Sequence, residues 1–284
     1  MKFGVITDCF KEDVGRGIEL ASQLGFDGVQ IYATEGVFSA DGLNKAARES
    51  YKRLLRDNKL EVSALCGDMG GHGYQIAEDN PLRIEKTKRI IDLAEDFETS
   101  VVTTHIGVIP SDKNDEQYAV MLEALGTCGL YAKTRGVTLA IETGPECAKV
   151  LLGFINDTQG GVGVNLDPAN FVMVTGQDPV EAVRLLGKHI VHTHVKDGKM
   201  LIKTDPKIIY GCFAVGGIEG LNVADYFKEL PVGAGDVDFP AYLAALKEIG
   251  YDGYLTIERE AGGDRLKDIA GAKAYIENII KCTL

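Results

Sequence analysis

The stretch VTLAIETGPECAKVLLGFINDTQGGVGVNLD (Val137–Asp167) decides the fold of this 284-residue chain. It contains two short runs, Val137–Glu142 and Val162–Asp167, that are almost continuously apolar. Such runs are typical of parallel strands that are buried on both faces. The segment between them, Glu146–Ile155, has a helical pattern. The stretch is therefore predicted to be a strand–helix–strand unit in which both strands end in a carboxylate.

The same alternation continues in both directions along the chain. Eight strand-like runs, each followed by a helical pattern, match the count of a closed α/β barrel of the (β/α)8 type. An open doubly wound sheet would carry a glycine-rich phosphate motif after its first strand, and the turn TDCFKEDVGRG (Thr7–Gly17) lacks it. The predicted strands are Phe3–Thr7, Gly28–Tyr32, Glu61–Leu65, Val101–His105, Val137–Glu142, Val162–Asp167, His189–Val195 and Tyr254–Glu258. The predicted helices are Gly15–Leu24, Leu43–Asn58, Pro81–Phe97, Asp115–Arg135, Glu146–Ile155, Pro179–Leu186, Pro240–Ile249 and Arg265–Lys281.

The chain contains no linker, low-complexity tract or change of composition, so residues 1–284 are predicted to form a single TIM-barrel domain. One long excursion, 196–235 (Lys196–Gly235), separates the seventh strand from the seventh helix. Segments of this length inside compact domains are usually lids or interface arms. The excursion contains IIYGCFAVGGIEG (Ile208–Gly220), an apolar stretch spaced by glycines. We expect it to cover the mouth of a pocket or to pack on a second subunit, in a homodimer or homotetramer.

The composition excludes several classes of protein. With 45% hydrophobic and 25% charged residues, the chain is globular rather than disordered or collagen-like. Its net charge of −12 repels the phosphate backbone, so no nucleic-acid partner is expected. No apolar run approaches the ~18 residues of a membrane span, and the N-terminus lacks a signal-peptide pattern. We therefore expect no membrane partner and a cytoplasmic location, where the six scattered cysteines stay reduced.

Polar residues end five of the predicted strands. In barrels of this kind the active site lies at the carboxyl ends of the strands. Strands five to eight end in Glu142, Asp167, His194 and Glu258, and strand four ends in His105. The first three strands end in or near Asp8, Tyr32 and Cys66. Three carboxylates and an imidazole are thus brought to one rim.

Burying three carboxylates together is costly unless a positive charge neutralises them. A divalent metal ion does so directly, and three oxygen ligands with one nitrogen suit Mn²⁺, Mg²⁺, Co²⁺ or Zn²⁺ with positions left for substrate. A single acid at a strand end would be read as a solvated loop residue. Four such residues at equivalent positions favour a metal site instead.

The alternation of side chains along a strand places His192 on the same side of its strand as His194. His192 is then expected one layer below the metal, with Asn165 and Thr256 as hydrogen-bond partners. It either orients a ligand of the metal or acts on substrate. The alternative is a core histidine whose hydrogen bonds are satisfied.

Two other histidines are read differently. His72 lies in GDMGGHGY (Gly67–Tyr74), where glycines allow a close approach of the backbone, and is expected to line the pocket. The alternative is a loop residue without a role. His189 opens its strand on the opposite face and is given no function.

Five motifs carry a resemblance to a known family. The sequence resembles the sugar isomerase/epimerase superfamily with the xylose-isomerase-like TIM barrel, over nearly the whole chain. The motifs are IETGPE (Ile141–Glu146), NLDPAN (Asn165–Asn170), HTHVKD (His192–Asp197), VGAGDVDF (Val232–Phe239) and TIERE (Thr256–Glu260). The resemblance implies that Glu142, Asp167, His194 and Glu258 are metal ligands, that His105 is a pocket histidine, and that Glu146 and Lys196 face substrate. It leaves VGAGDVDF with a structural role.

The superfamily also contains metal-dependent AP endonucleases, from which this chain departs. Those enzymes hold several metals with additional histidines. Asn170 stands where one of them would be, and no histidine occurs between Lys196 and Phe239. A DNA-cutting site of that type is therefore not expected. No basic cluster suggests a clamp for a sugar phosphate, so an unphosphorylated small-molecule carbohydrate is the expected substrate.

The ligand set suits proton transfer next to a carbonyl. The metal would stabilise an enediolate while Glu142 and Glu258 remove and return the proton. Return to the same carbon gives epimerisation, delivery to the neighbouring carbon gives isomerisation, and loss of a hydroxyl gives dehydration. The sequence predicts a metal-dependent isomerase or epimerase of a small ketose, cyclitol or keto-acid. Two alternatives stay open: a lyase that dehydrates a keto-polyol such as an inosose, and a non-catalytic sugar-binding barrel.

Overall fold

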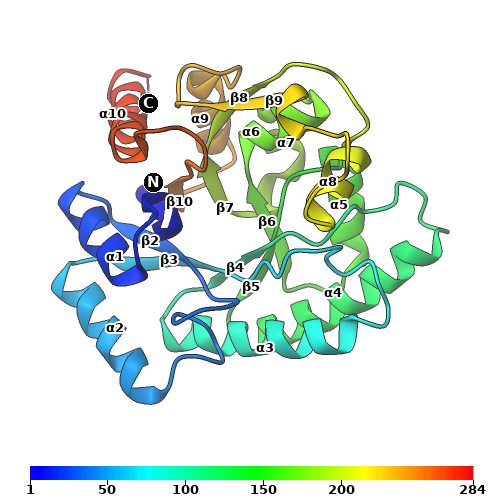
Figure 1. The fold of residues 1–284 in the computed structure, drawn as a ribbon, viewed down its shortest axis with the longest axis horizontal. Coiled ribbons are helices and arrows are strands. Elements are labelled where there is room, and N and C mark those ends of the chain that lie inside the picture. Colours follow the sequence, from blue (N-terminus) through cyan, green and yellow to red (C-terminus); the bar gives the residue numbers. More distant parts are fainter. Residues whose placement is uncertain (284) are drawn as a thin grey trace.

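A computed structural model describes residues 1–283 and shows eight parallel strands closed into a barrel (Figure 1). The strands follow one another around the barrel in the order β1-β10-β7-β6-β5-β4-β3-β2. The predicted (β/α)8 barrel is therefore confirmed. The strands are β1 (Lys2–Ile6), β2 (Gly28–Tyr32), β3 (Glu61–Cys66), β4 (Val101–Thr104), β5 (Thr138–Glu142), β6 (Val162–Leu166), β7 (Ile190–Val195) and β10 (Tyr254–Ile257).

Within residues 1–283, eight helices pack around the barrel with ends close to those predicted. The helices are α1 (Val14–Gln23), α2 (Lys45–Asp57), α3 (Asn80–Asp96), α4 (Glu116–Thr134), α5 (Ala148–Asp157), α7 (Pro179–Leu186), α9 (Phe239–Glu248) and α10 (Arg265–Thr283). Helix α2 begins later than predicted because the Asn44 side chain accepts a hydrogen bond from Ala47 N and caps the helix. None of the described helices is long and apolar enough to cross a membrane.

Short helical turns complete the connections. They are η1 (Thr7–Phe10), α6 (Pro168–Asn170), the π-helical turn η2 (Phe171–Thr175), η3 (Gly187–His189) and η4 (Val223–Asp225). The main hydrophobic core lies between the barrel and the helices, and it includes Ile31 and Leu65 from strands with Ile18 and Ile91 from helices. Burial of such side chains contributes about 1.5–3 kcal/mol each.

The interior of the barrel is polar in the layer beneath the rim. His192 Nε2 lies 3.0 Å from Gln30 Oε1 and 2.9 Å from Thr256 Oγ1. Gln30 Nε2 donates to Thr103 Oγ1 at 3.3 Å. These four buried side chains come from four different strands, so the layer ties opposite sides of the barrel together.

The excursion 196–235 is a folded subassembly rather than a long loop. It contains β8 (Asp197–Met200), α8 (Pro206–Ala214) and β9 (Phe227–Leu230), and β8 pairs with β9 in an antiparallel sheet (Figure 1). A small second core joins it to the barrel through Met173 and Ile209. The Asp197 carboxylate accepts hydrogen bonds from the backbone N–H groups of Gly198, Gly233, Gly235 and Val237. The VGAGDVDF motif is thus held in place by the first residue of β8.

Candidate metal centre and substrate pocket

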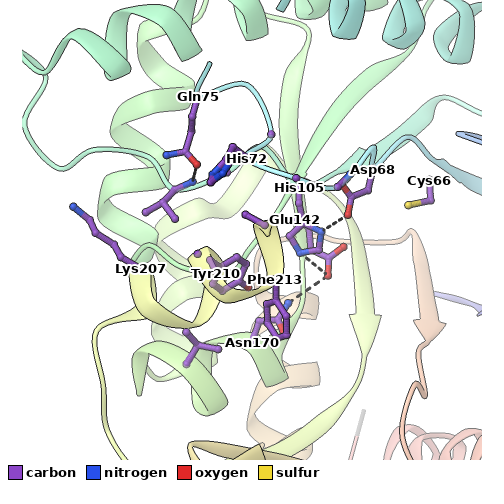
Figure 2. Close-up of a pocket in the computed structure, with 18 of the residues that line it drawn as sticks. Cys66, Asp68, His72, Gln75, His105, Glu142, Asn170, Lys207, Tyr210 and Phe213 are labelled. Carbon is purple, nitrogen blue, oxygen red and sulfur yellow. Dashed lines mark hydrogen bonds and ion pairs between the residues drawn. The ribbon is translucent and has the colours of Figure 1, made fainter. Parts of the chain in front are cut away.

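A cavity of about 470 Å³ opens at the carboxyl ends of the barrel strands. Its inner part is lined by Glu142, His194 and Glu258, and α8 supplies one wall with Tyr210 and Phe213 (Figure 2). Its volume lies within the range of about 300–1,000 Å³ that is usual for ligand pockets. The excursion therefore forms part of the pocket.

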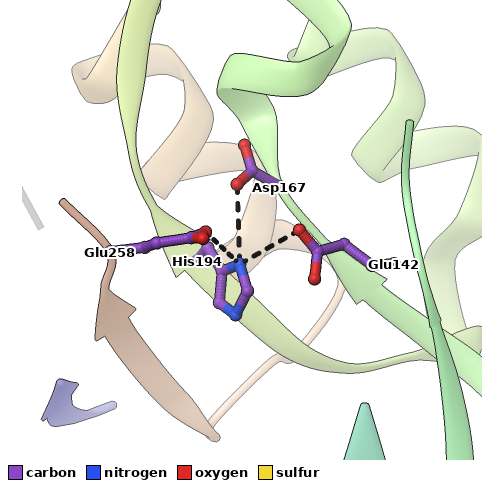
Figure 3. Close-up of side chains that lie close together, drawn as sticks. All are labelled: Glu142, Asp167, His194 and Glu258. Carbon is purple, nitrogen blue, oxygen red and sulfur yellow. Dashed lines mark ion pairs between the residues drawn. The ribbon is translucent and has the colours of Figure 1, made fainter. Parts of the chain in front are cut away.

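Glu142, Asp167, His194 and Glu258 converge at the inner end of this cavity (Figure 3). One potential ligand atom from each residue lies within 4.8 Å of those of the other three, and all four residues are buried. His194 Nδ1 lies 2.8 Å from Glu258 Oε2, 3.5 Å from Asp167 Oδ2 and 3.6 Å from Glu142 Oε1. The structure brings together all four residues that the sequence predicted as metal ligands.

The strand ends and the turns behind them hold the carboxylates. Asp167 follows β6 and caps α6, because its Oδ1 accepts from Asn170 N at 3.0 Å. Asn170 Nδ2 in turn lies 3.3 Å from Glu142 Oε1 and donates to Thr143 O at 2.9 Å. The motif NLDPAN thereby links two of the carboxylates through one asparagine.

The imidazole of His194 is oriented from across the barrel. Its Nε2 lies 3.1 Å from Gln30 Oε1, an oxygen that can only accept. Gln30 Nε2 donates to Thr103 Oγ1, which helps to hold the amide in place. A hydrogen bond from Nε2 to Gln30 would leave Nδ1, which faces the carboxylates, as the nitrogen ligand.

Asn165 takes a different partner from the one predicted. Its Nδ2 lies 3.2 Å from Glu142 Oε2 and 3.1 Å from His194 Nε2, and no bond to His192 occurs among the described residues. The predicted pairing of His192 with Asn165 is wrong, whereas the pairing with Thr256 is confirmed. The β6–β7 register shifts between Val164 and Asn165, which carries Asn165 toward the rim.

The chemistry of the cluster fits a divalent cation. Apart from their contacts with one another, the buried atoms Asp167 Oδ2, His194 Nδ1 and Glu258 Oε2 have no hydrogen-bond partner in residues 1–283. Burial alone would lower the pKa of His194, but the carboxylates of Glu142 and Glu258 outweigh it and raise the pKa well above its usual value. The cluster thus attracts positive charge, and three oxygen donors with one nitrogen are suited to a hard or borderline divalent ion.

His105 lies beside the cluster and lines the cavity. Its Nδ1 is 3.1 Å from Asp68 Oδ2 and its Nε2 is 3.6 Å from Glu142 Oε1. Burial opposes its charge, but Glu142 and Asp68 raise the pKa of His105 to about 10. A cationic donor therefore faces the pocket next to one of the carboxylates.

Lys196 lies on the opposite side, next to Glu258. Its Nζ is 3.2 Å from Glu258 Oε1 and 2.7 Å from Glu260 Oε2, and the side chain is buried. Burial raises the pKa of Glu258, but Lys196 and His194 reverse this and hold it below its usual value. Lys196 thus keeps Glu258 ionised.

The remaining predicted site residues lie farther from the cluster. His72 lines the cavity, whereas His192 and Glu146 are buried outside its lining. Burial raises the pKa of Glu146 to about 8, and its Oε2 has no partner among the described residues. His189 lies in η3, away from the cavity lining.

Several pocket residues were not predicted from the sequence. Gln30 gave no signal within the apolar strand GVQIY, and Asp68 stood in the glycine-rich loop without an obvious partner. Tyr210 and Phe213 lie in the apolar, glycine-spaced stretch Ile208–Gly220. That pattern is the sequence signal that could have pointed to them. A side chain at Gly144 would collide with the Tyr210 hydroxyl, so this glycine of IETGPE makes room for the wall from α8.

The chain belongs to the xylose isomerase-like TIM barrel family, whose model matches residues 18–281. It is 25% identical to the uncharacterized protein MJ1311 of Methanocaldococcus jannaschii, over 98% of this chain and 90% of that one. It is 24% identical to an inosose dehydratase of Clostridium perfringens, over 58% of this chain and 55% of that one.

Solved structures show the same fold. A xylose isomerase domain protein from Planctomyces limnophilus has a TM-score of 0.81 at 26% identity, covering 99% of this chain and 97% of that one. A D-tagatose 3-epimerase-like protein has a TM-score of 0.75 at 21% identity, covering 100% and 98%. The IOLI protein, solved with a bound zinc atom, has a TM-score of 0.75 at 18% identity, covering 100% and 99%.

Proposed function

We propose that this protein is a divalent-metal-dependent isomerase or epimerase of a ketose, cyclitol or keto-acid. The observation that carries the proposal is the buried cluster of Glu142, Asp167, His194 and Glu258 at the inner end of the cavity. These four residues would hold the ion. When bound, a divalent cation supplies stabilisation of the negative charge that develops on a carbonyl oxygen and a neighbouring hydroxyl during proton transfer.

Glu142 and Glu258 are the proposed proton-transfer groups. Their carboxyl groups lie on opposite sides of His194 (Figure 3), on strands separated in the barrel by β6 and β7. One carboxylate would take the proton from the carbon next to the carbonyl, and the other would return a proton from the other side. Lys196 keeps Glu258 ionised and so able to accept a proton.

His105 is proposed to bind a substrate oxygen. Its raised pKa makes it a charged donor at the pocket wall, where it would stabilise charge on an oxygen next to the reacting carbon. Asp68 positions the ring through Nδ1, which leaves Nε2 toward the cluster.

Proteins of the same fold support the reaction class and the metal. Similar structures include a D-psicose 3-epimerase in the presence of D-fructose, at 18% identity and a TM-score of 0.68, and an L-ribulose 3-epimerase, at 18% and 0.72. A further one, from Mycobacterium smegmatis, is in complex with magnesium, at 22% identity and a TM-score of 0.71.

Exchange of substrate hydrogen with solvent tests the proposal. The protein is loaded with Mn²⁺ and incubated in D₂O with a panel of ketoses, cyclitols and keto-acids. We expect deuterium at one carbon next to the carbonyl of at least one compound, detected by NMR, and no exchange by the chelator-treated protein. Absence of exchange across the panel, or equal exchange without metal, would contradict the proposal.

Dehydration is the second candidate, and the match to an inosose dehydratase favours it. Mass spectrometry of the product separates the two reactions, because dehydration removes one water from the substrate and isomerisation or epimerisation leaves the mass unchanged.

A further inference from the structure

The cavity continues well beyond the carboxylate cluster. Figure 2 shows Gln75 and Lys207 at the end of the pocket that lies away from Glu142 and Cys66. The whole space of about 470 Å³ falls within the usual range for drug-sized ligands. A single sugar ring in contact with Glu142 and Glu258 would leave this outer region unfilled.

The outer region presents two amides that are held by hydrogen bonds, Gln75 and Gln117, and an exposed lysine, Lys207. Gln75 Nε2 donates to Gln117 Oε1 at 3.0 Å, and Gln75 Oε1 accepts from Val108 N at 3.2 Å. Both amides are thereby oriented, while Gln117 Nε2 and Lys207 Nζ have no hydrogen-bond partner within residues 1–283. Asp115 Oδ1 accepts from Gln117 N at 2.9 Å and leaves its second oxygen available. Fixed donors and acceptors of this kind recognise hydroxyl groups.

An aromatic wall connects the outer region with the cluster. The ring centroids of His105 and Tyr210 are 6.2 Å apart, and those of Tyr210 and Phe213 are 6.0 Å apart. Phe213 is 52% exposed although it lines the cavity. An exposed aromatic face beside oriented amides suits a ring with an apolar C–H face and a polar edge, which is the chemistry of a sugar.

We infer that the substrate carries a second sugar ring. This inference rests on the proposed function: the ketose unit lies at the cluster, and a glycosidically linked ring packs on Phe213 with its hydroxyls toward Gln117 and Lys207. The outer region is then a binding subsite that takes no part in the proton transfer. The presence of both a cation and a carboxylate, Lys207 and Asp115, favours a neutral ring over a phosphate group.

Calorimetric titration of the Mn²⁺-loaded protein tests the subsite. The probes are D-fructose and three disaccharides that contain a fructose unit, namely isomaltulose, lactulose and turanose. We expect at least one disaccharide to bind about tenfold or more tightly than D-fructose. The subsite is refuted if D-fructose binds as tightly as all three.

Variants then test whether the higher affinity for the disaccharide comes from the outer region. Phe213→Ala and Gln117→Ala should reduce the affinity for the tighter disaccharide to that for D-fructose, without changing the affinity for D-fructose. Ile208→Ala is the matched control, because Ile208 lies on the same helix and is 44% exposed but does not line the cavity. Equal weakening of both ligands by the two test variants would contradict the inference.

Failure of the subsite and failure of the proposed function give different results. Tighter binding of a disaccharide without any deuterium incorporation would leave the subsite standing and refute the proposed function. Deuterium incorporation into a ketose, with no disaccharide binding more tightly than D-fructose, would refute the subsite alone.

Discussion

The two halves of the barrel rim have different chemistry. The strands β1 to β4 end in the uncharged residues Ile6, Tyr32, Cys66 and Thr104. The ends of β5, β6, β7 and β10 instead bring the three carboxylates and the imidazole. These last four strands are neighbours in the barrel. The first half instead provides the loop with His72 and the side chains of Asp68 and His105. The three carboxylates and the imidazole of the cluster thus lie on one arc, and the opposite arc adds Asp68 and His105 beside them.

The division is not complete, because side chains of the first half also reach the cluster, His105 at Glu142 and Gln30 at His194. Gln30 on β2 contacts both His192 and His194 on β7. A residue from the first half therefore helps to orient the imidazole of His194. Each of the following predictions compares a change in one arc with a matched change elsewhere.

The largest effect is expected from neutralising a proton-transfer group. Glu142→Gln should lower the rate of deuterium exchange by about 10²–10⁴-fold, because the amide cannot accept the proton. Asp68→Asn, a matched change in the first half, should lower it by about tenfold, since it only loosens His105. Exchange rates followed by NMR check both values. An equal loss of exchange rate in the two variants would contradict the different roles given to the two halves of the rim.

Metal binding should stabilise the fold through His194. At a Mn²⁺ concentration of 100 times Kd, the folded state gains about 2.7 kcal/mol, which thermal unfolding followed by circular dichroism detects. His194→Gln should abolish this gain. His189→Gln, a change just before the same strand, should keep it, because His189 lies away from the cavity lining. Retention of the full gain by His194→Gln would contradict the predicted ligand set.

Loss of the cross-barrel contact should weaken the metal site without removing a ligand. Gln30→Leu removes the contact between Gln30 Oε1 and His194 Nε2 and so loosens the orientation of the imidazole. We expect Mn²⁺ affinity to fall by about 10–100-fold, measured by electron paramagnetic resonance titration. Gln117→Leu is the control, since Gln117 also lines the cavity but bonds to Gln75. Unchanged affinity in Gln30→Leu would show that the two arcs are independent.

The last prediction concerns the buried carboxyl of Glu146. Burial raises its pKa from 4.5 to about 8 in the folded protein, so the folded state keeps a proton that the unfolded state loses between these values. Its contribution to stability is therefore complete below pH 4.5 and declines by about 1.4 kcal/mol per pH unit up to about pH 8. Glu146→Gln should remove this slope from the free energy of unfolding, measured in urea at pH 5.5 to 7.

The exposed Glu123 on α4 provides the control for that experiment. Glu123→Gln should leave the slope unchanged, because an exposed carboxyl has similar surroundings in both states. If Glu146→Gln has the same pH dependence as the wild type, Glu146 is ionised in the folded protein and its pKa is not raised by burial.

The sequence predicted the convergence of Glu142, Asp167, His194 and Glu258 because each follows a strand, and a closed parallel barrel brings equivalent strand ends to one rim. Gln30 could not be predicted, since it lies 164 residues from His194 and makes contact only when the barrel closes. Asn165 was paired wrongly because a register shift between strands leaves no trace in the alternation along one strand. The pairing of β8 with β9 was missed because DGKM and FKEL have no clear strand pattern.

Diffraction from crystals grown with Mn²⁺, with anomalous data collected at the manganese absorption edge, tests the metal site most directly. The account predicts one anomalous peak per chain between His194 Nδ1 and the carboxylates of Glu142, Asp167 and Glu258. A peak elsewhere in the molecule, or none at a saturating concentration of Mn²⁺, would contradict it.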